Sequence, residues 1–161
     1  VLKGLVDKYT WHDIGSSFLP SDLLAAMLAA QIERYDEIFE KRMKIWNTYH
    51  NNLSDLEDMG ILRLPVIPDY VEHNAHMYNI LLPSDKIRED LINKLKERGI
   101  MAYICYVPLH SSPYGLSLGN KPSDCPVTER VGNTALRLPL YADMLEEDAL
   151  YVVKNIKDIL I

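Results

Sequence analysis

Two loop segments carry most of the side chains in this chain that can bind a ligand. The first, residues 9–20 (YTWHDIGSSFLP), places two serines after Gly15, between an aromatic pair and a proline. Serine hydroxyls donate hydrogen bonds to phosphate oxygens, and they also cap loops. The second, residues 106–115 (YVPLHSSPYG), presents Tyr106 and His110. An imidazole can hydrogen-bond a hydroxyl or pair with a phosphate. These two segments could therefore bind a ligand that carries phosphate and hydroxyl groups.

Other catalytic patterns fit the sequence poorly. Gly15-Ser16-Ser17 is not the Gly-x-Ser-x-Gly turn of a hydrolase nucleophile. His73 and His76, with the two cysteines, supply atoms that zinc prefers, but their spacing matches no zinc motif. We therefore expect neither a serine hydrolase nor a metal site.

The composition is that of a globular protein. The chain has 161 residues, enough for one domain with a core, and its 48% hydrophobic and 25% charged residues are close to the globular average. The net charge of −6 and the mixed charges of residues 33–44 predict a solvated helix face and exclude a nucleic-acid surface. No apolar run approaches the roughly 20 residues of a membrane span. Cys105 and Cys125 form no disulfide framework, which favours a cytoplasmic location.

The first long element predicted is a helix over residues 21–59. Pro20 suits its start, Ser21 or Asp22 can accept hydrogen bonds from its first amides, and Gly60 can end it. Such a length in a small domain suggests a bend. Its small side chains, which let another backbone approach closely, are Ala25, Ala26, Ala29 and Ala30.

The rest of the pattern predicts an α+β fold in which a small sheet is covered on one face by helices. The predicted strands are residues 76–82, 100–107 and 136–140, and the predicted helices are residues 84–99 and 143–160. Ser84 or Asp85 can cap the first of these helices, and Asp143 with Glu146 resembles a capping box for the second. Residues 111–128, rich in Ser, Gly and Pro, are expected to form a loop.

Four sequence blocks, in order, resemble one protein family. They are residues 9–31, NAHMYNI at 74–80, YVPLHSSPYG at 106–115 and ALRLPLYADMLEEDA at 135–149. The chain resembles the DegT/DnrJ/EryC1/StrS family of sugar-nucleotide aminotransferases. Within the family, it is most similar to the dTDP-4-amino-4,6-dideoxygalactose transaminases of enterobacterial common antigen and lipopolysaccharide sugar synthesis. The likeness covers nearly the whole chain and is weakest over residues 117–134.

The resemblance implies the small C-terminal domain of a fold-type I aminotransferase that uses pyridoxal 5'-phosphate (PLP). Residues 1–20 would form an active-site loop that crosses to the other subunit of a homodimer, and residues 21–161 the small domain with its long leading helix at the dimer interface. The family's large domain, with the lysine that binds PLP, would precede Val1, so we expect the 161 residues alone to be inactive. The parent enzyme would transfer an amino group from glutamate to a dTDP-4-keto-6-deoxy sugar.

The resemblance also implies a cofactor contact in the first loop. The family has an asparagine there that reaches the PLP phosphate of the other subunit, and Ser17 occupies the matching position. Ser16 or Ser17 would therefore contact the phosphate, with loop capping as the alternative. Tyr9 and Trp11 would line the same cleft for substrate, although packing explains them equally well. The family's Arg and Met in this motif are replaced here by leucine and proline.

The remaining candidates lie later in the chain. Tyr106 and His110 match the family's segment near the sugar nucleotide, with a backbone-satisfied histidine as the alternative for His110. His76 is a further substrate-binding candidate, although its predicted strand favours burial with a single hydrogen bond. Arg137 can bind a carboxylate or phosphate with two hydrogen bonds, but a structural ion pair is the stronger expectation.

A competing interpretation comes from another functional class. The chain would be a stand-alone interaction or regulatory domain without catalysis, which needs the core but no ligand-binding loops. A surface on which Tyr9, Trp11, Ser17, Tyr106 and His110 cluster would favour the aminotransferase. Scattered positions would favour the interaction domain.

Overall fold

The computed structural model describes residues 20–161. Tyr9, Trp11, Ser16 and Ser17 lie outside these residues, so their predicted roles stay predictions. The order of the elements is α1 (Asp22–Glu33), α2 (Tyr35–Asp58), β1 (Tyr78–Leu81), α3 (Asp85–Glu97), β2 (Tyr103–Ile104), α4 (Pro113–Ser117), a 3-10 turn (Pro122–Asp124), α5 (Pro126–Thr134), β3 (Ala135–Leu138) and α6 (Glu146–Leu160). Within residues 20–161, no helix combines the length and the apolar character needed to cross a bilayer.

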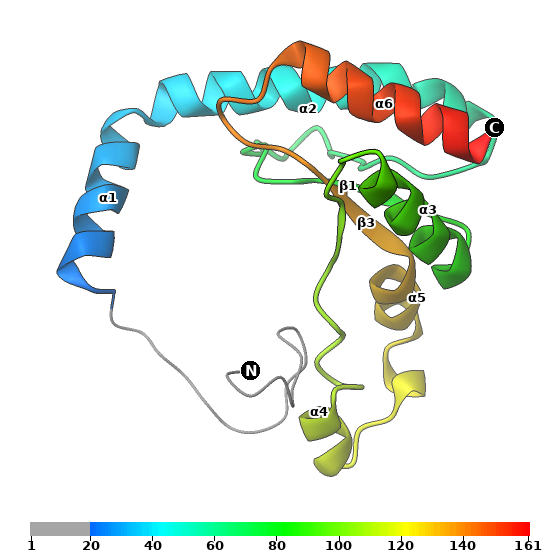
Figure 1. Ribbon diagram of the computed structural model, residues 1–161. Coiled ribbons are helices and arrows are strands. Elements are labelled where there is room, and N and C mark those ends of the chain that lie inside the picture. Colours follow the sequence, from blue (N-terminus) through cyan, green and yellow to red (C-terminus); the bar gives the residue numbers. More distant parts are fainter. Residues whose placement is uncertain (1–19) are drawn as a thin grey trace.

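The predicted helix over residues 21–59 is in fact two helices. The Ser21 hydroxyl caps α1 by accepting a hydrogen bond from the amide of Leu24 at 3.3 Å, as expected. The helical path breaks at Arg34, where φ is −109° and ψ is 22°. The Arg34 guanidinium there makes two hydrogen bonds to the Glu37 carboxylate, of 3.0 and 2.8 Å. Figure 1 shows α1 turning away from α2 and standing clear of the rest of the molecule.

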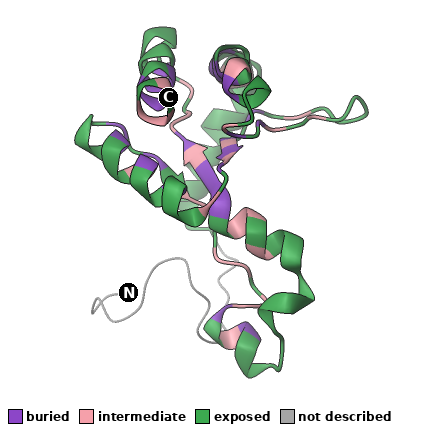
Figure 2. Ribbon diagram, turned by 90° about the vertical axis from the view of Figure 1, so that its right-hand side faces the viewer, coloured by how far each residue is buried: buried purple, intermediate pink, exposed green. Residues whose placement is uncertain are grey.

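The sheet is antiparallel, with strand order β1-β3-β2. In its register Tyr78 faces Leu138 and Ile80 faces Leu136. Because side chains alternate along a strand, these four lie on one face, where they join the core formed with side chains of α2, α3 and α6. Figure 2 shows the buried residues gathered around the strands. The prediction of a small sheet covered on one face by helices is confirmed.

The strands are shorter than predicted. The prediction of a strand over residues 100–107 is wrong beyond Tyr103 and Ile104, which pair with Arg137 and Leu136 of β3. The partner strand limits the ladder, because β3 begins where α5 ends and is followed by Pro139, which has no N–H to donate.

The first strand also begins later than expected. His76 precedes β1 and is exposed, so the expectation that it lies buried in a strand is wrong.

Helix starts and loops show which local signals were reliable. Ser84 caps α3 as predicted, by accepting a hydrogen bond from the amide of Ile87. The capping box at Asp143 is wrong, because α6 begins at Glu146 and the Asp143 carboxylate instead accepts from Lys41. The loop predicted over residues 111–128 is wrong as well, since it contains α4, the 3-10 turn and the start of α5.

Two buried tyrosines should make the fold sensitive to alkali. Tyr49 and Tyr78 are fully buried, and burial raises the pKa of both phenols well above the usual value of about 10. The phenolates are therefore penalised only in the folded state, so stability is intact below about pH 10 and is lost as the pH rises further. Denaturant unfolding across this range should show a smaller alkaline loss for Tyr78→Phe. The exposed Tyr70→Phe is the control, and equal losses in both variants would contradict the expectation.

Candidate ligand-binding site

The open face of the sheet, opposite the core, carries a row of polar side chains. Arg137 on the middle strand has Asn79 as its β1 partner and Tyr103 as its β2 partner, so all three lie on this face. Just beyond β2, the Cys105 sulfur lies 3.8 Å from the Asn79 side-chain oxygen. Burial raises the pKa of the Cys105 thiol, which disfavours the thiolate and argues against a nucleophilic role.

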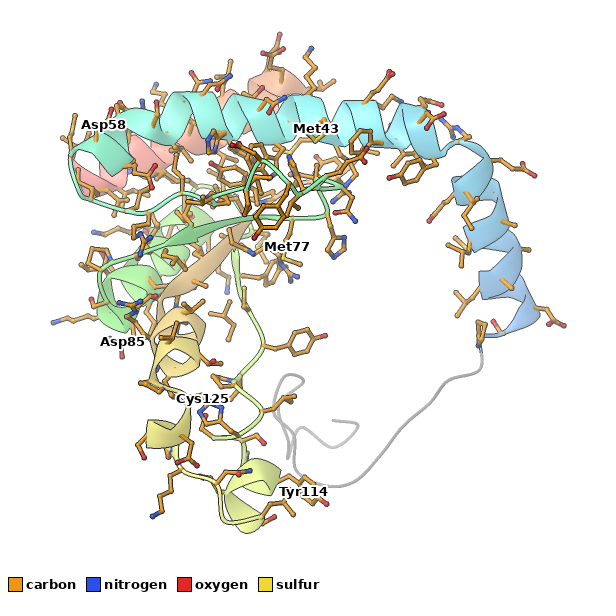
Figure 3. The ribbon with its side chains drawn as sticks, turned by 180° about the vertical axis from the view of Figure 1, so that it is seen from behind. Met43, Asp58, Met77, Asp85, Tyr114 and Cys125 are labelled. Carbon is orange, nitrogen blue, oxygen red and sulfur yellow. The ribbon has the colours of Figure 1, made fainter. Side chains whose placement is uncertain are left out.

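A groove of about 460 Å³ opens beside this row of side chains. Its polar and charged lining residues include Arg42, His76, Tyr103, Arg137 and Tyr141, and the lining contains no aspartate or glutamate. Figure 3 labels Met77, another lining residue, which directly precedes β1. The groove therefore presents positive charge beside apolar and aromatic walls.

The two arginines of the groove are in different situations. Arg42 of α2 donates from Nε to the carbonyl of Ala75 at 3.0 Å and from Nη2 to the carbonyl of His76. Arg137 makes no hydrogen bond or ion pair with any residue in 20–161. The structural ion pair expected for Arg137 is thus not found in the part of the chain that the structure describes.

The second candidate segment is fixed by a separate set of contacts. His110 Nε2 lies 3.2 Å from the Glu129 carboxylate of α5, with side chains only 14% and 22% exposed. Both atoms are shielded from solvent, and their geometry is not that of a hydrogen bond. The contact is an ion pair when the imidazole is protonated. Ser112 is buried, and its hydroxyl donates to the carbonyl of Leu109 at 2.7 Å and accepts from the amide of Gly115 at 3.1 Å.

The described candidates lie in different surroundings. His76 lines the groove, whereas His110 contacts Glu129 of α5. Tyr106 is 65% exposed. Sequence reasoning missed Glu129, which has no local motif that would reveal it. It also missed Ser112 as a cap, although serine before proline at the start of a helix is a usable signal.

The groove does not fit the covalent attachment of PLP. That attachment needs a lysine amine at the site, and no lysine lines the groove formed by residues 20–161. The serines suggested for the phosphate, Ser16 and Ser17, lie outside the described residues. The groove therefore offers a place for a ligand but no lysine that would hold the cofactor covalently.

The fold is found in solved sugar aminotransferases. The chain is similar to a putative sugar aminotransferase, Spr1654 from Streptococcus pneumoniae, solved in its PMP form, with a TM-score of 0.77 and 21% identity over 86% of this chain and 34% of that one. A DegT DnrJ EryC1 StrS aminotransferase from Brucella abortus matches with a TM-score of 0.69 and 23% identity, covering 84% of this chain and 35% of that one. The chain thus has part of the fold of a fold-type I PLP aminotransferase, as predicted.

Sequence relatives agree with the structural likeness. A pleiotropic regulatory protein from Geobacillus stearothermophilus is 33% identical over 96% of this chain. A dTDP-4-dehydro-2,3,6-trideoxy-D-glucose 4-aminotransferase from Saccharopolyspora spinosa is 30% identical over 83% of it. The chain spans 41% and 33% of these two relatives. Residues 2–157 match the model of one family. The chain belongs to the DegT/DnrJ/EryC1/StrS aminotransferase family.

Proposed function

We propose that this chain is the C-terminal part of a PLP-dependent enzyme that transfers an amino group from glutamate to a dTDP-4-keto-6-deoxy sugar. The family match over residues 2–157 carries the proposal. Two relatives whose names specify dTDP-sugar aminotransferases, from Saccharopolyspora spinosa and Micromonospora megalomicea, support the nucleotide. The product would be a dTDP-4-amino-4,6-dideoxygalactose for enterobacterial common antigen or lipopolysaccharide, made in the cytoplasm.

The roles proposed for individual residues follow from the family motifs that they match. Ser16 and Ser17 would contact the PLP phosphate from across the subunit boundary, with Tyr9 and Trp11 lining the same cleft. When bound, PLP supplies the electron sink for amino transfer, and its lysine would come from outside these 161 residues. The later candidates, His76, Tyr106 and His110, would contact or position the sugar nucleotide.

The exposed surface of α1 supports the proposed homodimer. No residue of α1 is buried, and its apolar side chains are more than half exposed. These residues are Leu23, Leu24, Met27, Leu28 and Ile32. A helix with this much exposed apolar surface is normally covered by another surface, and a second subunit would provide one.

The proposal is tested by assaying the chain together with a lysine-bearing large domain, reached by reading the coding sequence upstream of Val1. We expect PLP-dependent transfer of ¹⁵N from labelled glutamate to a dTDP-4-keto-6-deoxy sugar, detected by mass spectrometry. The GDP-linked keto sugar is the matched control, because one relative is named as a GDP-perosamine synthase. Transfer to the GDP-linked sugar alone would overturn the nucleotide assignment, and no transfer to either would overturn the function.

One observation supports the second candidate, a stand-alone regulatory domain. The relative that is 33% identical is named as a pleiotropic regulatory protein. This candidate takes the lead if the amino-transfer assay fails and the chain binds a protein partner through α1.

A further inference from the structure

We infer that a pocket at the outer edge of the sheet binds the phosphate group of a small phosphate monoester, and that Arg63 and Arg130 receive it. This outer pocket is lined by residues 60–63, 81–83, 130 and 134. It lies beyond β1, where the segment that follows α2 pairs with that strand. It shares no lining residue with the groove beside Arg137, and the inference goes beyond the proposed function.

The first support is the charge of the outer pocket. Arg63 and Arg130 both line it, and its lining within residues 20–161 includes no aspartate or glutamate. Neither guanidinium makes a hydrogen bond or an ion pair with any residue that the structure describes. The two cations therefore lack a counter-charge there, although the chain as a whole has a net charge of −6. Positive charge gathered at a concave site attracts anions.

The second support is the origin of the two arginines in different, ordered elements. The amide and carbonyl of Arg63 exchange hydrogen bonds of 2.9 Å with those of Leu81. Arg130 lies in α5, where its carbonyl accepts a hydrogen bond of 2.8 Å from the Thr134 hydroxyl. Both side chains therefore extend from fixed backbone to one pocket. Each guanidinium can donate two parallel hydrogen bonds to phosphate oxygens, and two guanidiniums match the double charge of a phosphate monoester.

The third support is the apolar part of the lining. Ile61, Leu62, Leu81, Leu82 and Pro83 contribute it, and Leu62 and Leu82 are buried. The volume of about 250 Å³ is slightly below that of sites for drug-sized ligands. The pocket therefore suits a phosphate that carries a short carbon chain better than it suits a nucleotide.

The test is a titration of the ¹⁵N-labelled 161-residue chain with butyl phosphate, followed by NMR. We expect saturable shifts at the amides of Leu81 and Leu82 and at the Nε of both arginines. Arg63→Gln and Arg130→Gln should each weaken binding by about tenfold or more, because each removes charge-assisted hydrogen bonds. The matched control is Lys96→Gln, which removes one positive charge from an exposed residue outside the pocket and should leave binding unchanged.

Inorganic phosphate and pentanoate are the comparison ligands. Inorganic phosphate lacks the carbon chain, so equal or tighter binding of it would overturn the monoester. Pentanoate has the same butyl chain but a single negative charge, so tighter binding of it would overturn the phosphate assignment. Absence of saturable shifts with butyl phosphate, or equal weakening by Lys96→Gln, would overturn the site itself. Arg130→Lys, which keeps the charge but loses the parallel donors, should weaken binding less than Arg130→Gln, and it gives a reading even if a glutamine variant fails to fold.

Discussion

The double substitution Leu24→Glu, Leu28→Glu is expected to weaken self-association of the chain strongly. These side chains are 59% and 56% exposed on a helix that buries nothing within the described structure. Burying one leucine side chain contributes about 1.5–3 kcal/mol to the free energy of association. Losing two such side chains should therefore raise the Kd of a dimer by about 10²–10⁴-fold. Sedimentation velocity across a wide range of protein concentration measures the change directly.

Gln31→Glu is the matched control for this experiment. Gln31 lies on the same helix and is exposed, so its substitution adds a negative charge without removing apolar surface. We expect it to leave the association nearly unchanged. A wild-type chain that stays monomeric throughout, or a control as disruptive as the double variant, would contradict the assignment of α1 to the interface.

The substitution Gly115→Ala is expected to displace the segment that carries His110. A Cβ at position 115 would lie 2.7 Å from the carbonyl carbon of His110 and closer still to the carbonyl oxygen of Leu109. Backbone cannot yield as a flexible side chain can, so the turn capped by Ser112 must rearrange. Overpacking of this kind costs about 1–3 kcal/mol or more. Denaturant unfolding gives the loss of stability, and amide hydrogen exchange over residues 106–115 shows where the change is concentrated.

Gly119→Ala separates this clash from the general cost of losing a glycine. Gly119 has a φ of +91°, which disfavours alanine, but a Cβ there would meet no atom within 4 Å. We expect it to cost about 1–2 kcal/mol and to leave hydrogen exchange around His110 unchanged. If Gly119→Ala exposes that segment as much as Gly115→Ala does, then the close approach of Leu109 and His110 is not what fixes it.

The parts of the fold that sequence could predict are those governed by neighbouring residues. Ser84 and Gly99 bracket α3, and the φ of +76° at Gly99 is one that glycine adopts readily. The predictions that failed concern features that depend on residues far away in the sequence. The length of β2 is limited by Pro139 across the ladder, and Asp143 is drawn from its expected cap by Lys41, over one hundred residues earlier. Nor does a proline or glycine mark the break at Arg34.

The candidate site shows the same division. The sequence singled out His110 and Arg137 as side chains able to bind anions, because residue type alone suggests that. It could not show that Glu129 faces His110, since the two meet only when α5 packs beside the loop. It also favoured an ion pair for Arg137, because the register that gives this residue an open sheet face is a tertiary property.

The break at Arg34 lets α1 change its direction relative to α2. With 12 residues, α1 is about 18 Å long, so a swing of about 20° at the break moves its far end by about 6 Å. Surface charges hold Arg34 to the first turns of α2: Arg34 and Lys41 both contact Glu37, and they hold the pKa of its carboxyl at about 2. Dissolved ions screen the attraction between such exposed charges. Raised ionic strength is therefore expected to loosen the contact between Arg34, the residue at which α1 turns away, and the first turn of α2.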